Sequence, residues 1–595
     1  MSGFVGRVSD TYVKDDLIKA LKLIEFDDDD STGILFCDNK NCAVHRIVGK
    51  VDDLVPLIPE KTNGKLGIGH IRNSTYMRQS LKNVYPIMSE NDEVSLIVHG
   101  LIDNVGPLRR KLIRRGFNFK TESAIEVVAN LIEVNLRNGV KSLEALREAV
   151  LLIEGSYAVV AVFKKEEDRI YFAKNITPVT IGRKNGTMMI TDDFASIANE
   201  AQEYYYPNDG EIGFITKDSL EVYNLKLEQQ EAVFTVTSVS EESLELGNYP
   251  HYMLKEIEEA PRVIKRLVNQ YFDGVKYRFE DALIERIYEA DNIIFIAAGT
   301  SYNAALIGQR YLRTLNKKVD VFIASEWHFY PYQSGEKPLY VLISQSGETA
   351  DVLKCLEVIE SYNGDVLAIT NTEVSSLYRR ADYRLLLHAG TEVSVASTKA
   401  YIAQITLLTL LYARIANKVT TITALDKVIK AINELIKSRD EIKAIAADFA
   451  DAKDVFYLGR GFDYDVAVEA QLKMKETTYI HAEAYAGGEF LHGPVALVTK
   501  GLPVVVFISD EVAVEAMREV IVELEKREAN VIVCSALPFA VKSDRFSTKT
   551  IVKVYHSPIV FAVFGQYLAY YTAIALGRNV DRPRNLSKAV RGRDV

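Results

Sequence analysis

The chain has 595 residues, of which 48% are hydrophobic and 26% charged, and its formal net charge is −10 at pH 7. That length exceeds what one hydrophobic core supports, so we expect roughly two to four globular domains. The acidic balance argues against an extended nucleic-acid surface, and no signal peptide or bilayer-spanning stretch is expected. We therefore expect a cytoplasmic protein that binds neither nucleic acid nor a membrane.

The cysteines are the next constraint. Cys37, Cys42, Cys355 and Cys534 show neither metal-ligand spacing nor the density of a disulfide framework. No metal site is expected.

The order of apolar runs predicts the domains. Residues 1–235 mix β-branched runs such as GILFC and YAVVAVF with helical stretches, which predicts an α+β domain, and residues 236–254 form a polar linker. Strands and helices then alternate strictly over residues 255–425 and again over 440–580, which predicts two similar α/β domains with parallel sheets. Residues 581–595 form a C-terminal tail.

The first of the two α/β domains contains three clusters of hydroxyl residues that suit a phosphate site. Buried strands end at Gly299-Thr300-Ser301 and at Ser344-Gln345-Ser346-Gly347-Glu348-Thr349, and a third hydroxyl cluster, Val395 to Lys399, also opens a helix. Helix N-termini at the carboxyl ends of parallel strands favour anions. A single Ser or Thr there is ordinarily just a helix cap, but three clusters together favour a phosphate. The second domain has acidic residues at the equivalent places, so we expect phosphate only in the first.

The second α/β domain carries acid and base groups instead. Lys473 and Glu476 share a helical face, and a glycine-rich loop is expected to present His481, Glu483, Glu489 and His492. Such groups suit aldose–ketose interconversion, although a Lys/Glu pair is more often a solvated surface feature. Lys588 in the tail is a candidate Schiff-base lysine.

The motifs AAGTSYN, SQSGETAD, VASTKA, LGRG, KMKETTYIHAEAYAGGEFLHGP and DRPRNLSKAV resemble the two sugar-isomerase (SIS) domains of the glutamine:fructose-6-phosphate aminotransferase family. The resemblance implies an N-terminal-nucleophile αββα domain before the SIS pair, no cofactor, and a homodimer. It assigns the proton shuttle between C1 and C2 to Glu476, ring opening to His492 of the neighbouring subunit, the Schiff base to Lys588, and a supporting role to Lys473. The implied substrate contacts are Thr300, Ser301, Ser344, Gln345, Ser346 and Thr349 to the phosphate, and Val395 and Ser397 to the sugar chain.

The first domain departs from the family at its glutaminase site. The nucleophilic cysteine is replaced by Ser2, the segment that normally carries a tryptophan reads Ile71-Arg72-Asn73-Ser74, and a deletion at His99-Gly100 removes the oxyanion asparagine. Ala124 stands where a carboxylate binds glutamine. Serine is a weak nucleophile, and loss of an oxyanion donor costs about two to three orders of magnitude in rate. We expect no useful glutaminase activity.

These features predict an enzyme that converts fructose 6-phosphate to glucosamine 6-phosphate with free ammonia, or with ammonia from a separate glutaminase. Three alternatives stay open at this point: glucosamine-6-phosphate deamination, which is the same chemistry reversed; phosphoketose–phosphoaldose isomerisation without nitrogen; and a non-catalytic sugar-phosphate sensor. Retention of Glu476, His492 and Lys588 speaks against the sensor, which needs only the phosphate contacts.

Overall fold

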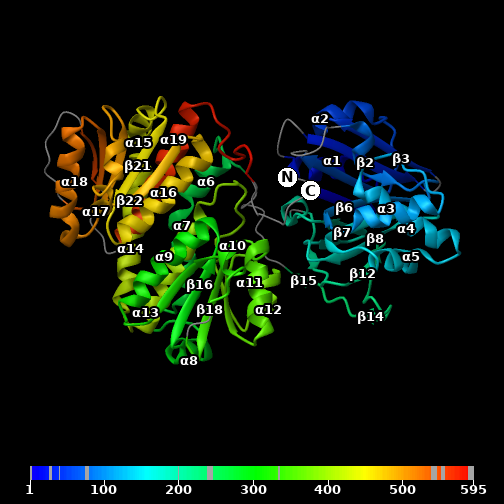
Figure 1. Ribbon diagram of the computed structural model, residues 1–595, viewed down its shortest axis with the longest axis horizontal. Helices are drawn as coiled ribbons and strands as arrows, with labels where there is room; N and C mark the ends of the chain where they lie inside the picture. The colour runs from blue at the N-terminus through cyan, green and yellow to red at the C-terminus, as the bar shows by residue number, and fades with distance from the viewer. Residues whose placement is uncertain are drawn as a thin grey trace. The chain divides into compact units, whose positions relative to one another are not determined.

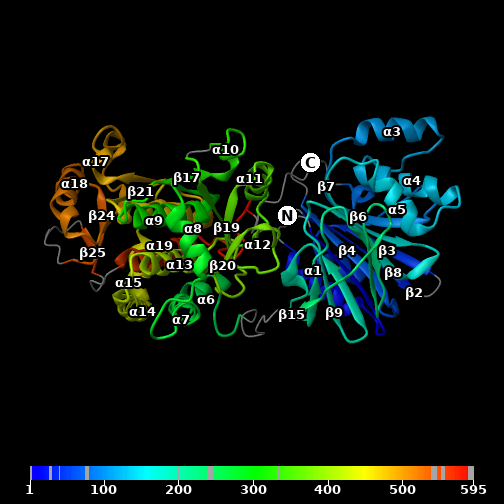
Figure 2. The ribbon, with the colours of Figure 1, turned by 90° about the horizontal axis from the view of Figure 1, so that it is seen from below.

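The computed structural model describes residues 3–25, 30–38, 41–73, 80–198, 200–236, 246–332, 335–537, 546–550 and 556–586. The chain forms two compact units that divide between residues 242 and 243. Figures 1 and 2 show each unit from two directions.

The first unit contains two antiparallel sheets. In sheet order, the larger consists of β15 (Thr235–Val236), β11 (Glu203–Tyr205), β9 (Thr180–Lys184), β10 (Thr187–Thr191), β1 (Gly3–Ser9), β4 (Leu66–Asn73), β2 (Asp30–Asp38) and β3 (Asn41–Val48). The smaller consists of β14 (Gln229–Gln230), β13 (Leu220–Tyr223), β12 (Ile212–Ile215), β8 (Glu166–Asn175), β7 (Gly155–Phe163), β6 (Val94–Ile102) and β5 (Ile87–Met88).

Helices cover the outer faces of these two sheets. Alternate residues of β1 face opposite ways, as a strand requires: Val5 packs in a cluster with α1 (Lys14–Ile24) and α2 (Val51–Leu54), while Phe4 faces the second sheet. The second sheet is covered in turn by α3 (Val105–Arg114), α4 (Ala124–Arg137) and α5 (Ser142–Val150), which lie together beside β6 and β7 in Figure 2. The expected αββα layering is confirmed.

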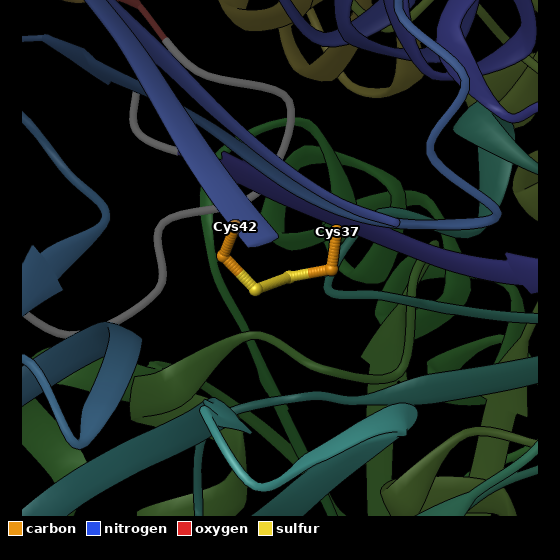
Figure 3. Close-up of a disulfide and its surroundings, with 2 residues drawn as sticks. All are labelled: Cys37 and Cys42. Atoms are coloured by element: carbon orange, nitrogen blue, oxygen red, sulfur yellow. A yellow bond between two sulfur atoms is a disulfide. The ribbon is translucent and has the colours of Figure 1, made fainter. Parts of the chain in front are cut away.

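One disulfide in this unit was not anticipated from the cysteine pattern. Cys37 on β2 and Cys42 on β3 are directly paired across the hairpin, with their Cα atoms 4.1 Å apart, and their sulfur atoms are bonded (Figure 3). Cys355 and Cys534 are free and buried. The sequence held a signal, since two cysteines five residues apart can face each other across a two-residue turn.

The second unit contains two five-stranded parallel sheets with the same strand order. The first runs β17 (Val319–Ile323), β16 (Asn292–Ala297), β18 (Pro338–Ser344), β19 (Asp365–Thr370) and β20 (Tyr383–Leu386). The second runs β22 (His481–Ala486), β21 (Asp454–Gly459), β23 (Pro503–Ile508), β24 (Asn530–Ser535) and β25 (Phe546–Thr550). In both, the strand order reverses beside the first strand, so the crevice where ligands of open α/β sheets bind lies at the carboxyl ends of β16 and β18 in one and of β21 and β23 in the other.

Helices cover both faces of each parallel sheet. The first copy contains α6 (Tyr252–Glu258), α7 (Ala260–Tyr271), α8 (Asp281–Glu289), α9 (Gly299–Arg313), α10 (Ala324–Trp327), α11 (Ala350–Ser361), α12 (Ser376–Arg380) and α13 (Lys399–Ile415). Then follow α14 (Thr420–Lys437), α15 (Arg439–Ala447), α16 (Phe462–Thr478), α17 (Gly487–Phe490), α18 (Val514–Lys526) and α19 (Ser557–Ala575). In Figure 1, α9 and α11 lie on opposite sides of β16 and β18. One hydrophobic core runs through α9, α13, α16 and α19 and joins the two copies.

Helix α19 corrects the expectation that no stretch could span a bilayer. It is 19 residues long and contains an 18-residue window with a mean hydropathy of 1.3, which is enough by length and composition. However, 83% of the apolar window is buried inside the fold. The helix packs against α16 and α15 as the central element of the second copy, which accounts for its apolar sequence.

Candidate functional site

The candidate phosphate site lies at the crevice of the first parallel sheet. β16 runs into α9 through Gly299, whose φ is +55°, and β18 runs through SQSGET into α11. Gly347 in this turn has a φ of +68°, and a Cβ there would lie 2.1 Å from the Ser375 hydroxyl. Only glycine fits both constraints, so the turn that follows Ser344 depends on Gly347.

Hydrogen bonds set which way the hydroxyl groups of this turn point. The Ser344 hydroxyl accepts from the Gly347 amide at 3.0 Å and lies 2.9 Å from that of Thr349. The Ser346 hydroxyl accepts from the Glu348 amide at 3.1 Å. On α9, the Ser301 hydroxyl accepts from the Gln404 side-chain amide at 2.9 Å. A hydroxyl has one proton and accepts through its lone pairs, so Ser301 and Ser346 keep their protons for a ligand.

The acid and base groups of the second copy meet this site directly. Helix α16 places Glu469, Lys473 and Glu476 on one face: the Lys473 ammonium lies 2.5 Å from Glu476 and 3.5 Å from Glu469. The Thr300 hydroxyl, at the N-terminus of α9 in the first copy, donates to Glu469 at 3.1 Å and accepts from Lys473 at 3.0 Å. The expected contact between Lys473 and Glu476 is present, and it is buried at its lysine end rather than solvated.

Burial and charge determine the protonation of this cluster. Burial raises the pKa of the Glu469 carboxyl to about 7, against the opposing effects of Lys473 and the Asn303 amide, which donates to it at 2.7 Å. For Lys473, burial alone would lower the pKa, but the charges of Glu476 and Glu469 outweigh it and the pKa is raised. The result is an ammonium held between the carboxyl groups of Glu476 and Glu469. Glu476 has 21% of its side chain exposed, so it is the group of the three that a ligand can reach.

Sequence reasoning missed Glu469. Its side chain is 1% exposed and joins both copies through Thr300 and Asn303. The signal was its position, four residues before Lys473 and seven before Glu476, which puts all three on one helical face.

The third hydroxyl cluster is organised by a buried carboxylate. Glu392 accepts from the Ser397 hydroxyl at 3.0 Å and from the backbone amides of Thr398 at 2.8 Å and Ala400 at 3.1 Å. The amide of Val395 donates to the Asp581 carbonyl at 2.9 Å. The start of the C-terminal tail therefore lies against this cluster, while Lys588 itself lies outside the described residues.

His492 is not brought to this cluster within one chain. It is exposed, follows α17, and its neighbours Phe490 and Leu491 belong to the separate core beneath α18. Among the described residues its side chain has no hydrogen bond or ion pair with Glu476 or Lys473. The expectation of one flexible loop was wrong, because His481 and Glu483 lie on strand β22 and Glu489 on α17.

In the first unit, the start of β1 is fixed by a buried acid. Asp192 accepts from the Phe4 amide at 2.8 Å and lies 2.6 Å from Nδ1 of His99. Gly100 follows with a φ of +112°, and a Cβ there would lie 2.2 Å from the Ser156 carbonyl oxygen. These contacts therefore fix the backbone at the start of β1, the strand that would present an N-terminal nucleophile. Ser2 itself lies outside the described residues.

The remaining predicted positions of the first unit lie on β4 and at the start of α4. Arg72 lies at the end of β4, with its guanidinium 5.3 Å from the Tyr85 ring centre, and Asn73 is the last residue of that strand. Ala124 begins α4, next to its cap Ser123, whose hydroxyl accepts from the Ile125 amide at 3.3 Å. The methyl group of Ala124 carries no charge that could pair with a bound amino group. Over the described parts of both units, no three His, Cys, Asp or Glu side chains gather as a metal site would require.

Comparison with known proteins agrees with this architecture. Residues 286–414 and 448–575 each match the SIS domain family, and residues 70–199 match the glutamine amidotransferase domain family. The two SIS matches confirm the duplication. The C-terminal domain of glucosamine-fructose-6-phosphate aminotransferase from Francisella tularensis has a similar structure, with a TM-score of 0.54 and 32% identity, covering 57% of this chain and 99% of that one.

Full-length relatives extend the match to the whole chain. The glutamine–fructose-6-phosphate aminotransferase (isomerizing) of Geobacillus kaustophilus is 35% identical over 99% of this chain and 100% of its own length. The enzyme of that name from Streptococcus pneumoniae is also 35% identical, with the same coverage of both chains. The chain belongs to the isomerizing glutamine–fructose-6-phosphate aminotransferase family.

Proposed function

We propose that the chain converts fructose 6-phosphate and ammonia to glucosamine 6-phosphate in a site built from both SIS copies. The observation that carries the proposal is the contact of Thr300 with Glu469 and Lys473, which places a phosphate-type turn of one copy against an acid/base cluster of the other. The activity in the names of the full-length relatives agrees with it.

The chemistry divides among the residues as follows. The phosphate is bound by Ser301, Ser344, Gln345, Ser346 and Thr349. Thr300, beside Ser301 on α9, links the phosphate site to the acid/base cluster. The sugar chain is contacted by Val395 and Ser397. Lys588 condenses with the carbonyl of the open-chain ketose to form an imine and releases water, and ammonia then displaces the lysine amine to leave the sugar imine. Glu476 then moves the proton between C1 and C2, because it is the reachable carboxylate beside the Lys473 ammonium.

Ammonia rather than glutamine is proposed as the nitrogen donor. Ser2 replaces the expected cysteine, His99 is followed directly by Gly100, and Ala124 supplies no carboxylate for an amino group. Each change removes a different requirement of glutamine hydrolysis: the nucleophile, the oxyanion donor and the substrate anchor. A separate glutaminase can serve as the ammonia source, and the first unit then acts as a scaffold or regulatory domain.

We also propose a homodimer and the bounds of each domain. His492 is exposed and forms no hydrogen bond or ion pair with Glu476 among the described residues, which suits a histidine that completes the site of a partner chain in a homodimer. The proposed domains are residues 1–235, a linker at 236–254, SIS domains at 255–425 and 440–580, and a functional tail at 581–595. A cytoplasmic location is proposed, in keeping with the burial of α19 in the fold.

The test supplies fructose 6-phosphate with either ammonium or glutamine and measures glucosamine 6-phosphate. We expect product with ammonium only, and loss of at least about a hundredfold in rate for Lys473→Met. Lys475→Met is the matched control, because Lys475 lies on the same helix and bonds to Gln471 instead. Product from glutamine alone would contradict the proposed donor. Glucose 6-phosphate formed without amine, or binding without turnover, would contradict the proposed reaction.

A further inference from the structure

The hydroxyl groups around the proposed sugar site differ in hydrogen-bond direction. Ser301 accepts from the Gln404 amide, and Ser346 accepts from the Glu348 amide, so each has a proton to donate to an anion. Ser397 is the opposite case. Its partner is the Glu392 carboxylate, 3.0 Å away, which can only accept, and so the Ser397 proton is already committed.

The contacts of Glu392 keep this direction as long as its carboxyl group is ionised. One of its oxygens accepts from the Thr398 and Ala400 amides at 2.8 and 3.1 Å, and the other accepts from Ser397. The residue is 5% exposed and its carboxylate lies at the N-terminus of α13, where the helix dipole favours a negative charge. Within the described residues, the half-buried Ser397 hydroxyl has this one hydrogen-bond partner, which leaves its lone pairs for a ligand.

We propose that Glu392 is a positioning residue that makes Ser397 a hydrogen-bond acceptor, so that the site selects a sugar hydroxyl that donates to it. This inference rests on the proposed function, because it places the sugar chain beside Ser397. A phosphate oxygen or a carbonyl oxygen cannot donate and is rejected at this position. The serines at the phosphate donate hydrogen bonds, whereas Ser397 at the sugar chain accepts one. This difference fixes the orientation in which the substrate binds.

Glu392→Gln inverts this polarity with almost no change in shape. The glutamine carbonyl oxygen keeps the two backbone amides, so its NH2 group replaces the oxygen that faces Ser397. That group can only donate to Ser397, whose proton is then free for the ligand. The distinguishing probes are fructose 6-phosphate and its monodeoxyfluoro analogues at C1, C3 and C4, because fluorine cannot donate a hydrogen bond.

The experiment measures dissociation constants by calorimetry without ammonia, using the full-length chain. For the wild type we expect one analogue to bind about tenfold or more weakly than fructose 6-phosphate, since an acceptor then faces an acceptor. In Glu392→Gln this ratio should fall towards one, and in Ser397→Ala it should also fall. A merely structural role of Glu392 would weaken all ligands alike and leave the ratio unchanged.

The outcomes distinguish failure of this inference from failure of the proposed function. Equal binding of every analogue by the wild type, or an unchanged ratio in Glu392→Gln, overturns the inference while leaving the proposed function standing. If Glu392→Gln does not fold, Ser397→Ala decides, and retention of the ratio in that variant overturns the inference. Failure of the wild type to bind fructose 6-phosphate at all overturns the proposed function on which the inference rests.

Discussion

Asp463 offers a sharp test of the electrostatics in the second SIS copy. It lies in the first turn of α16 at the crevice equivalent to the phosphate site, and its carboxylate accepts from the amide of Ser509 at 2.8 Å and from the Ser509 hydroxyl at 2.6 Å. Burial raises the pKa of Asp463 to about 6, against the effect of these two donors. In the repeat, Asp463 takes the position of Ser301 in the first copy.

The sign of the pH dependence follows from that raised pKa. Well below its unfolded-state pKa of 3.8 the carboxyl is protonated in both the folded and the unfolded state and does not affect stability. The destabilisation grows as the pH rises from there and is complete above the folded-state pKa of about 6. A rise from 3.8 to about 6 corresponds to about 3 kcal/mol at pH 8 and roughly half of that at pH 5. Asp463→Asn removes the charge and keeps both hydrogen bonds, because its NH2 group can donate to the Ser509 hydroxyl.

Scanning calorimetry at pH 8 and pH 5 measures the effect. For a unit of about 350 residues, 3 kcal/mol corresponds to a rise of about 4 °C in the midpoint at pH 8, with a smaller rise at pH 5. The transition of this unit is identified by its upward shift on adding fructose 6-phosphate.

Asp465→Asn is the matched control. Asp465 lies two residues further along α16, and burial raises its pKa too, but its carboxylate pairs with Arg310, one of whose nitrogens is 2.9 Å away. Asp465→Asn removes that ion pair together with the charge, so it should raise the midpoint less than Asp463→Asn or lower it. An unchanged or lowered midpoint for Asp463→Asn at pH 8 would refute the reasoning.

Three further predictions follow from the same geometry. Gly347→Ala should weaken fructose 6-phosphate binding by at least about tenfold in calorimetry, because its Cβ would meet the Ser375 hydroxyl at 2.1 Å; unchanged affinity would refute a rigid turn. Borohydride should trap the sugar covalently on the wild type but not on Lys588→Arg, as seen by intact mass, and labelling of both would refute the imine lysine. In denaturant, two thiols should react before reduction and four after it, because Cys37 and Cys42 are bonded; four at the outset would refute the disulfide.

Much of the isomerase fold could be predicted because its signals are local. Buried apolar strands such as NIIFIA in the first copy and DVFYLG in the second end at or shortly before a glycine, and a helix follows each of them. The same strand order in the two sheets follows from the repeat. The contact between Lys473 and Glu476 was accessible in the same way, since it depends only on helical spacing.

The interactions that could not be predicted depend on contacts distant in sequence. Glu469 joins the site because α16 packs against α9. It accepts from Thr300, which is 169 residues away in the sequence. Glu392 acts through the folded loop that leads into α13. Strand β22 looked like a glycine-rich loop because His481 and Glu483 are polar, yet it is an edge strand of the sheet with one solvated side.

The nitrogen donor decides the central claim most directly. The purified chain is given fructose 6-phosphate with unlabelled ammonium and amide-¹⁵N glutamine together, and the glucosamine 6-phosphate formed is analysed by mass spectrometry. Our account predicts product that carries only unlabelled nitrogen, because the proposed function assigns no glutamine hydrolysis to a first unit with Ser2, His99-Gly100 and Ala124. Incorporation of ¹⁵N at a rate that depends on the first unit, and that Ser2→Ala abolishes, would contradict it.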